Sequence, residues 1–168
     1  MKIHIIGGPG SGKTYIARHL AERYDIPILD LDDIFWDHEI KDYASRADPI
    51  QRDAALRRFI QKDSWIVEGA YDRWPTQSFQ SADWIFVLNP PLWLRQLRIF
   101  RRFLKRKIGF DRSRKETIRG QIELMAWNKK YDRDNLIRAQ FQLRDLSLSF
   151  IRCQGLSDVL QHLDKSRK

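Results

Sequence analysis

The sequence predicts an α/β protein in which helices cover both faces of a parallel β-sheet. Two observations support this prediction: five short apolar runs lie along the 168 residues, and segments with helical periodicity separate them. Parallel strands need such connections, because the chain must return over the sheet before the next strand begins. A chain of this length suffices for one domain with a sizeable core, and we expect residues 1–168 to form it.

The predicted elements follow from apolar spacing and from turn residues. Strands are expected at residues 2–6, 26–29, 64–67, 84–88 and 146–152. Helices are expected at residues 13–24, 49–61, 92–107, 113–143 and 157–163, the fourth with a break near Tyr131. Asp48 and Pro49 mark the start of the second helix, since an N-cap carboxylate is followed by Pro at the first helical position.

The formal net charge of +9 is confined to one segment of the chain. Between Leu94 and Arg119 there are eleven basic and two acidic residues, so the remainder, with 20 basic and 20 acidic residues, is neutral. The protein is therefore a neutral domain that carries one cationic segment.

Composition excludes several classes of protein. The hydrophobic fraction of 42% and the six Trp residues exclude wholesale disorder. The longest apolar run, residues 84–88, is far shorter than the ~20 residues that cross a membrane, and the amino-terminal run is too short for a secretory signal. Cys153 is the single cysteine, and we expect it to be buried rather than nucleophilic. These features predict a soluble cytoplasmic protein with no membrane partner.

The strongest motif is GGPGSGKT, which fits the phosphate-loop pattern G-x-x-x-x-G-K-[ST] at every fixed position. It follows a predicted strand and opens an amphipathic helix, whose N-terminus attracts anions. Small residues let the backbone N–H groups turn toward phosphate oxygens, while the Lys and Thr side chains suit phosphate and Mg²⁺. We therefore predict that nucleotide phosphates are held by Gly7, Gly8, Pro9, Gly10, Ser11, Gly12, Lys13 and Thr14, with Thr14 also a metal ligand.

Together with the later segments ILDLDDIFWD and WIVEGAY, this motif resembles the nucleoside- and nucleotide-kinase-like (adenylate-kinase-like) family of P-loop NTPases. The branch that it resembles most closely is that of the bacterial DNA topology modulation proteins. The resemblance covers nearly the whole chain. It implies a three-layer fold with a five-stranded parallel sheet in the order 2-3-1-4-5. It also implies ATP and Mg²⁺ as cofactors, and an arginine-rich helical lid with its adjoining helical region at residues 92–131.

Carboxylates follow the second and third predicted strands, at the sheet edge where ligands bind in open α/β folds. Asp30 and Asp32 match the D-x-D of small-molecule kinases, and the resemblance implies that Asp30 faces the metal and Asp32 the acceptor hydroxyl. Glu68 stands where many nucleotide kinases have Asp, and we expect it to support the metal's water shell. Asp33 is expected to cap the next helix instead.

The acceptor pocket is the part of the site that the sequence leaves open. Relatives that follow the third strand with Phe-Pro-Arg use the Arg to grip a nucleoside monophosphate, whereas this chain has Ala-Tyr-Asp-Arg, ending at Arg73. A monophosphate and an uncharged hydroxyl acceptor are therefore both expected candidates. Arg73 either contacts the substrate or pairs with Asp72. Aromatic residues nearby either stack on a planar ring or close the core: Phe35, Trp36, Tyr71 and Trp74.

The cationic segment 92–107 separates into two stripes on a helical wheel. An apolar stripe, expected to pack on the domain, comprises Trp93, Leu97, Phe100 and Leu104. A basic stripe on nearly the opposite side comprises Arg95, Arg98, Arg102 and Arg106. Like charges at this spacing repel one another and so indicate an anionic partner. In the family the lid closes over ATP, which implies that Arg98 and Arg102 act on the transferring phosphoryl group and that Arg106 binds the nucleotide.

Two functions are weighed. The first is an ATP-dependent kinase that transfers the γ-phosphoryl group to a hydroxyl of a small molecule such as a nucleoside or nucleotide, with Lys13, Asp32, Arg98 and Arg102 as catalytic residues. The alternative is a nucleotide-regulated DNA-binding or topology-modulating protein with little or no phosphotransfer. In that alternative residues 105–119 lie along DNA or another polyanion, and binding weakens steeply with salt and on replacing Arg112, Arg114 and Arg119.

Overall fold

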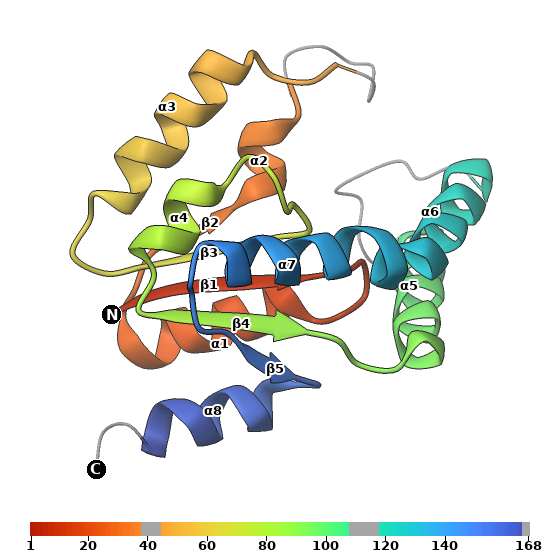
Figure 1. The fold of residues 1–168 in the computed structure, drawn as a ribbon. Coiled ribbons are helices and arrows are strands. Elements are labelled where there is room, and N and C mark those ends of the chain that lie inside the picture. The colour runs from red at the N-terminus through yellow and green to blue at the C-terminus, as the bar shows by residue number, and fades with distance from the viewer. Residues whose placement is uncertain (38–44, 108–117, 166–168) are drawn as a thin grey trace.

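The computed structural model describes residues 1–37, 45–107 and 118–165. Five strands form one parallel sheet in the order β2-β3-β1-β4-β5, which confirms the predicted fold class (Figure 1). The strands are β1 (Lys2–Gly7), β2 (Ile28–Asp30), β3 (Trp65–Gly69), β4 (Trp84–Leu88) and β5 (Ile151–Cys153). β1 is central, so the phosphate loop that follows it leaves the middle of the sheet.

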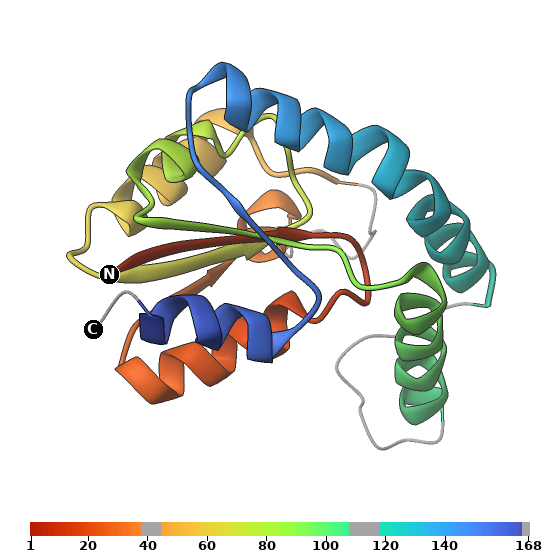
Figure 2. The same ribbon diagram turned by 60° about the horizontal axis from the view of Figure 1, so that its bottom comes forward.

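Helices connect the strands and cover both faces of the sheet. They are α1 (Lys13–Tyr24), α2 (Leu31–Phe35), α3 (Pro49–Ile60), α4 (Thr76–Ser81), α5 (Leu92–Lys107), α6 (Ile118–Tyr131), α7 (Ile137–Asp145) and α8 (Leu156–Lys165). A π-helical turn, η1 (Asp132–Leu136), joins α6 to α7. In Figure 2, α1 and α8 lie below the sheet, while α4 and α7 lie above it.

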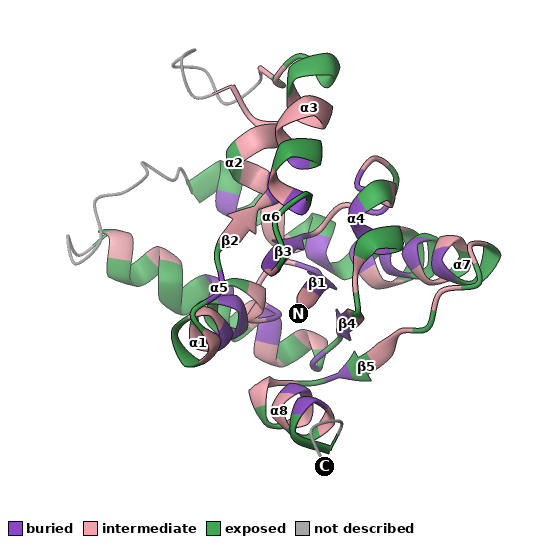
Figure 3. Cartoon of the chain, turned by 90° about the vertical axis from the view of Figure 1, so that its left-hand side faces the viewer, coloured by how far each residue is buried: buried purple, intermediate pink, exposed green. Residues whose placement is uncertain are grey.

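The core is divided by the sheet into two sides. Alternate residues of β1 point to opposite faces, so Ile3 and Ile5 pack with α1 and α8, whereas Ile6 packs with Phe79 of α4 and Leu143 of α7. Figure 3 shows the buried residues concentrated on the strands and on the inward sides of these helices. The sheet is thus apolar on both faces, as a parallel sheet requires.

Several element boundaries match the sequence prediction. Residues 13–24, 84–88 and 92–107 form α1, β4 and α5 as expected. The Asp48 carboxylate caps α3 by accepting a hydrogen bond from the backbone N–H of Ile50. No bounds were predicted for the short helices α2 and α4, because five or six residues are too few to show a period.

The last predicted strand is wrong in extent. β5 begins at Ile151 rather than at residue 146. The backbone N–H of Leu148 instead bonds the Leu143 carbonyl, and Ser147 has a positive φ of 55°, so this part of the chain forms the turn that ends α7. The expected break near Tyr131 is confirmed as η1, while residues 113–117 of the predicted long helix lie outside the described residues.

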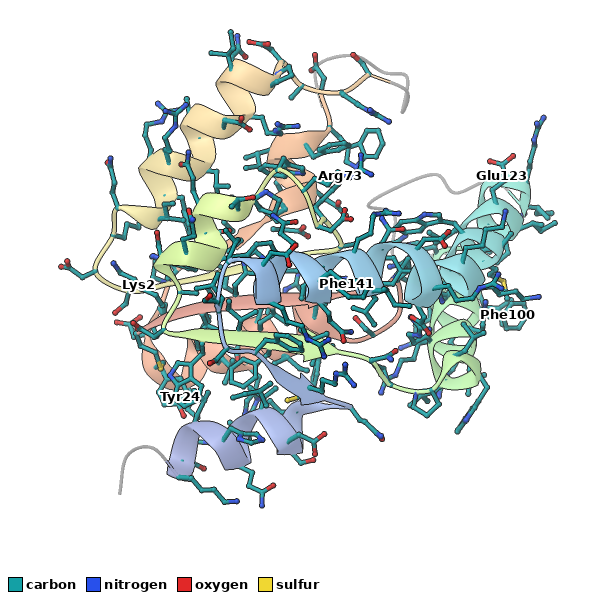
Figure 4. All side chains as sticks on the ribbon, viewed as in Figure 1. Lys2, Tyr24, Arg73, Phe100, Glu123 and Phe141 are labelled. Carbon is teal, nitrogen blue, oxygen red and sulfur yellow. The ribbon has the colours of Figure 1, made fainter. Side chains whose placement is uncertain are left out.

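The apolar stripe of α5 does not pack on the domain. The exposed fractions are 68% for Trp93, 44% for Leu97, 47% for Phe100 and 40% for Leu104, and Phe100 lies on the outer side of α5 in Figure 4. The inward face carries Arg95 and Ile99 instead, both essentially buried. In the described part of the chain no helix has the length and apolarity needed to cross a membrane.

Candidate active site

The phosphate loop joins β1 to α1 in a conformation that its glycines permit. Gly10 and Gly12 have φ angles of 72° and 99°, which side-chain-bearing residues rarely adopt. A Cβ atom on Gly10 would also lie 2.5 Å from the Arg95 carbonyl oxygen. Because Gly12 is the N-cap of α1 and has no side chain, the first turn of this helix presents its N–H groups to the loop.

The two functional side chains of the loop contact different partners. The Lys13 ammonium group donates to the Gly8 carbonyl oxygen at 3.3 Å. The Thr14 hydroxyl donates to the carboxylate of Glu68, at the end of β3. The phosphate loop and the neighbouring strand therefore meet at one point of the sheet edge.

Two carboxylates face each other across the β2–β3 ladder, where Asp30 is the register partner of Glu68. Burial and the negative charge of Glu68 raise the pKa of Asp30 to about 7. Burial also raises the pKa of Glu68, while the positive charge of Lys13 and the hydrogen bond from Thr14 oppose that shift. A half-buried and a buried carboxyl group that disfavour each other's charge are an arrangement that a cation relieves.

The donor set fits Mg²⁺. A hydroxyl and carboxylates are oxygen ligands, and Mg²⁺ commonly binds through one or two carboxylates while it keeps several waters. Within the described ranges no cluster of three or more His, Cys, Asp or Glu residues forms a full protein cage. The predicted metal ligands Thr14, Asp30 and Glu68 thus lie together in a form that suits a water-rich Mg²⁺ site.

Asp30, rather than Asp33, caps helix α2. The Asp30 carboxylate accepts from the backbone N–H of Asp32 at 2.9 Å, whereas Asp33 lies inside the first helical turn. The expectation that Asp33 caps this helix was wrong, because the helix begins directly after β2. The capping bond fixes the start of α2 and so positions Asp32, whose carboxylate accepts from the Tyr71 hydroxyl at 2.6 Å.

One cavity of about 1290 Å³ is lined by the phosphate loop and by the carboxylates after β2 and β3. Most predicted site residues line it: Pro9, Gly10, Gly12, Lys13, Thr14, Asp30, Asp32, Glu68, Arg98, Arg102 and Arg106. Gly7 and Gly8 form the back of the loop, where added Cβ atoms would meet the Leu88 carbonyl oxygen at 2.7 Å and the Arg95 guanidinium at 2.8 Å.

A second cavity of about 230 Å³ adjoins the first. Ser11, Gly12 and Tyr15 line it from the loop and α1, and Gly155 lines it from the segment after β5. Arg98 lines both cavities, and its guanidinium donates to the carbonyl oxygens of Gly10 at 3.2 Å and Ser11 at 3.1 Å. Arg98 therefore fixes α5 to the loop at the boundary between the two cavities.

Arg95 does not belong to the cavity-facing stripe. Its side chain is fully buried and forms an ion pair with Asp132 of η1 at 2.6 Å. The expectation that four arginines point the same way was wrong for Arg95, which turns toward η1, whereas Arg98, Arg102 and Arg106 line the cavity. The helical wheel could not show this, since Asp132 is 37 residues away.

The far end of the cavity is aromatic. Phe35, Trp36 and Tyr71 line it, and the ring centroids of Phe35 and Tyr71 are 4.5 Å apart. Trp74 packs on this group with its ring 5.5 Å from that of Tyr71 and carries the Arg52 guanidinium 4.3 Å above it. The aromatic group thus lines the cavity and packs on α3, and its stacking on a ligand ring stays a prediction.

Arg46 is a cavity residue that the sequence did not single out. An antiparallel bridge joins it to Trp36, and its guanidinium lies 5.7 Å from the centroid of the Phe35 ring. Arg73, by contrast, is exposed and lies outside the set of described residues that line the cavity. The suggested pairing of Arg73 with Asp72 was wrong, because Asp72 binds Arg138 at 2.8 Å.

Cys153 is buried as expected. Burial raises the pKa of its thiol to about 11, which keeps the group protonated and unreactive at neutral pH.

The chain is similar to nucleotide kinases over about half of its length. It is 27% identical over 105 residues to adenylate kinase 2 of Synechocystis sp., which covers 53% of this chain and 56% of that protein. It is 30% identical over 99 residues to the cytidylate kinase of Methanoregula boonei, which covers 52% of this chain and 54% of that protein. The chain thus spans about half the length of the curated relatives that it matches.

Solved structures share the fold over nearly the whole chain. A gluconokinase from Sinorhizobium meliloti 1021 superimposes with a TM-score of 0.56 at 15% identity, covering 95% of this chain and 87% of that one. Shikimate kinase from Acinetobacter baumannii, in complex with shikimate, superimposes with a TM-score of 0.55 at 19% identity, covering 98% of this chain and 93% of that one. The fold is that of the P-loop kinases.

No protein-family model matches the chain. The similarities support a nucleotide-kinase-like P-loop protein and give no support to the DNA topology modulation branch. Of the residues invoked for DNA, Arg112 and Arg114 lie outside the described residues, and Arg119 pairs with Glu123 at 3.0 Å.

Proposed function

We propose that this protein is a Mg²⁺-dependent kinase that transfers the γ-phosphoryl group of ATP to a hydroxyl of a small molecule. The observation that supports the proposal is the cavity, because Lys13 of the phosphate loop lines it together with Asp30, Asp32 and Glu68. A nucleotide-binding loop alone does not require carboxylates beyond the metal site. Asp32, held by the Tyr71 hydroxyl, supplies a further carboxylate at the acceptor side.

The two cavities divide the nucleotide between them. The phosphates lie in the larger cavity on the loop's N–H groups and Lys13, at the N-terminus of α1. The adenine lies in the smaller cavity, which Gly12, Tyr15 and Gly155 line. Residues 92–131 act as a lid with its adjoining helices, and Arg102 and Arg106 close on the phosphates from α5.

The acceptor enters from the aromatic end. The acceptor oxygen forms a bond to the γ-phosphorus as the bond to the β,γ-bridging oxygen breaks, and ADP leaves. Asp32 orients the hydroxyl and takes its proton, a role for which its position beside the cavity suits it. Burial and the charge of Asp32 raise the pKa of Tyr71, so the Tyr71 hydroxyl stays protonated as a donor that fixes Asp32.

Charge on the transferring group is stabilised from two sides. Bound Mg²⁺ would neutralise phosphate oxygens, and Thr14, Asp30 and Glu68 are the residues that would hold it or its waters. Lys13, Arg98 and Arg102, which line the cavity, would supply further positive charge to the transferring group. These arginines come from a helix that carries no acidic residue.

The aromatic wall favours a nucleoside or nucleotide acceptor, because planar rings stack on Phe35, Trp36 or Tyr71. The test is a survey with γ-labelled ATP against nucleosides, nucleoside monophosphates and small alcohols. We expect labelled product from at least one class, and its loss in Lys13→Ala. Transfer to none of them, together with ATP hydrolysis that Lys13→Ala leaves unchanged, would refute the kinase proposal.

A further inference from the structure

The outer face of α5 exposes a regular row of large apolar side chains. This apolar stripe consists of Trp93, Leu97, Phe100 and Leu104, whose exposed fractions run from 40% to 68%. Successive members are four, three and four residues apart, which places them all within about 60° on the helical wheel. A row this narrow and regular is typical of the seam along which two helices pack.

The rest of the domain contacts other sides of α5. Arg95 and Ile99 are essentially buried on the inward face, and the Gln96 amide donates to the Met125 carbonyl oxygen of α6 at 2.9 Å. In Figures 1 and 2, α5 lies beyond the end of the sheet, at the edge of the fold. The apolar stripe lines neither cavity, so it is an outward-facing surface that none of the described elements covers.

Positive charge lies beside the apolar stripe. Helix α5 carries seven basic residues and no acidic one. Of these, Arg101 and Lys105 are exposed, line neither cavity and form no ion pair with any residue that the structure describes. Arg101 lies one turn after Leu97, and Lys105 lies one turn after Arg101, so the two charges run along one side of the stripe.

We propose that the apolar stripe of α5 binds an acidic amphipathic helix of another protein. In the complex the apolar seam of the partner packs on the stripe, and carboxylates of the partner lie opposite Arg101 and Lys105. Removal of apolar surface from water stabilises the complex, while the flanking charges set the choice of partner. The proposal requires neither ATP binding nor phosphoryl transfer.

The charge and width of this face argue against two other occupants. A second copy of the chain would bring two α5 helices together, each with seven basic residues and no acid, and like charges across such a seam repel. A helix that lies in a bilayer surface buries a broad apolar face. Here Arg101 adjoins the stripe at Leu97, so the apolar surface is too narrow for that mode.

The test uses the full chain and a synthetic three-heptad peptide as the probe. The peptide has Leu at the a and d positions and Glu at the e and g positions, and the anisotropy of an attached fluorophore measures its Kd. We expect saturable binding by the wild type, and a Kd about tenfold or more higher for Leu97→Ser with Phe100→Ser. The same peptide with Lys in place of Glu should not bind.

A second variant tests the charges separately. Arg101→Glu with Lys105→Glu leaves the apolar stripe intact, and we expect the Kd for the acidic peptide to rise about tenfold or more. Added salt should weaken the binding of the acidic peptide to the wild type, because exposed charges are screened. All four replaced side chains are exposed, so circular dichroism should show the same fold in both variants.

Ile137→Ser with Phe141→Ser is the matched control. These side chains lie one turn apart on α7, with exposed fractions of 44% and 58%, so the variant removes a comparable apolar surface away from α5. We expect its Kd for the acidic peptide to equal that of the wild type. An equal loss of affinity in this control would overturn the assignment of the peptide to α5.

The remaining outcomes also decide the proposal. Absence of binding between the wild type and the acidic peptide overturns it. Binding to phosphatidylserine vesicles without binding to the peptide, if lost in Leu97→Ser with Phe100→Ser, assigns the stripe to a membrane and overturns it. A dimer in sedimentation that the same variant abolishes assigns the stripe to a second copy and overturns it as well.

Discussion

The hydroxyl of Thr14 donates a hydrogen bond to the carboxylate of Glu68, 54 residues later in the chain. This bond joins the second residue of α1 to the end of β3, and so holds the phosphate loop against the neighbouring strand. Glu stands here in place of the Asp that many nucleotide kinases have, and its longer side chain still reaches the Thr hydroxyl. We therefore expect Glu68 to serve the metal site despite the change of residue.

Replacing Glu68 with Gln tests that role. Gln keeps a side-chain oxygen that can accept from Thr14 but loses the negative charge, so we expect the Mg²⁺ concentration needed for half-maximal ATP binding to rise about tenfold. Binding titrations at fixed ATP and varied Mg²⁺ measure it. Asp33→Asn, which removes a nearby charge that neither caps α2 nor pairs with Glu68, is the control. An unchanged Mg²⁺ requirement in Glu68→Gln would exclude Glu68 from the metal site.

Mg²⁺-dependent ATP binding should depend on pH through Asp30. Its pKa of about 7 means that the carboxyl is half protonated near neutrality, and the metal needs the charged form. Affinity should therefore rise between about pH 6 and pH 8. Glu68→Gln removes a negative charge that raises the pKa of Asp30, so the midpoint should move to lower pH. The same midpoint in both proteins would contradict this assignment.

The conformation of Gly10 should be essential to the loop. Gly10→Ala places a Cβ atom 2.5 Å from a backbone oxygen at a φ of 72°, so we expect a loss of about 1–3 kcal/mol in the free energy of unfolding. A Cβ on Gly155 meets no atom within 4 Å, and Gly155→Ala should change stability by less than about 0.5 kcal/mol. Urea denaturation of the two variants measures this, and equal effects would show that the loop relaxes freely.

His4 should make the protein sensitive to acid. It is fully buried against Ser78, and burial lowers its pKa to about 3, whereas the unfolded chain protonates it near 6.5. The unfolded state therefore binds more protons between pH 6.5 and pH 3, so stability falls as the pH falls through this window. When the pH falls from 7 to 5, the free energy of unfolding of His4→Asn should decrease by about 2 kcal/mol less than that of the wild type, as denaturant unfolding measures it. If the stability of the wild type and of His4→Asn changed with pH in the same way, His4 would not be the cause of the acid sensitivity.

The sequence predicted the parts of the site that depend on neighbours in the chain. The loop from Gly7 to Thr14 is one local motif, and Asp30 and Glu68 meet because parallel strands end at the same edge. These features need only the strand order and the pattern of residues near each strand end.

The parts that the sequence missed depend on distant partners. The apolar stripe of α5 was expected to face inward, but Asp132 pairs with Arg95 and turns the opposite side of the helix to the core. Arg46 reaches the cavity only through its bridge to Trp36. No periodicity within either segment carries this information, so it could not be read from the sequence.

The most direct test of the proposed kinase is phosphoryl transfer by Asp32→Asn. Asn keeps the size of the side chain and can still accept from Tyr71, but it cannot take a proton from the acceptor. With the acceptor identified in the survey, we predict a loss of about 100-fold or more in kcat, with the Kd for MgATP unchanged. Transfer at the wild-type rate in Asp32→Asn would contradict the assignment of the acceptor side of the cavity.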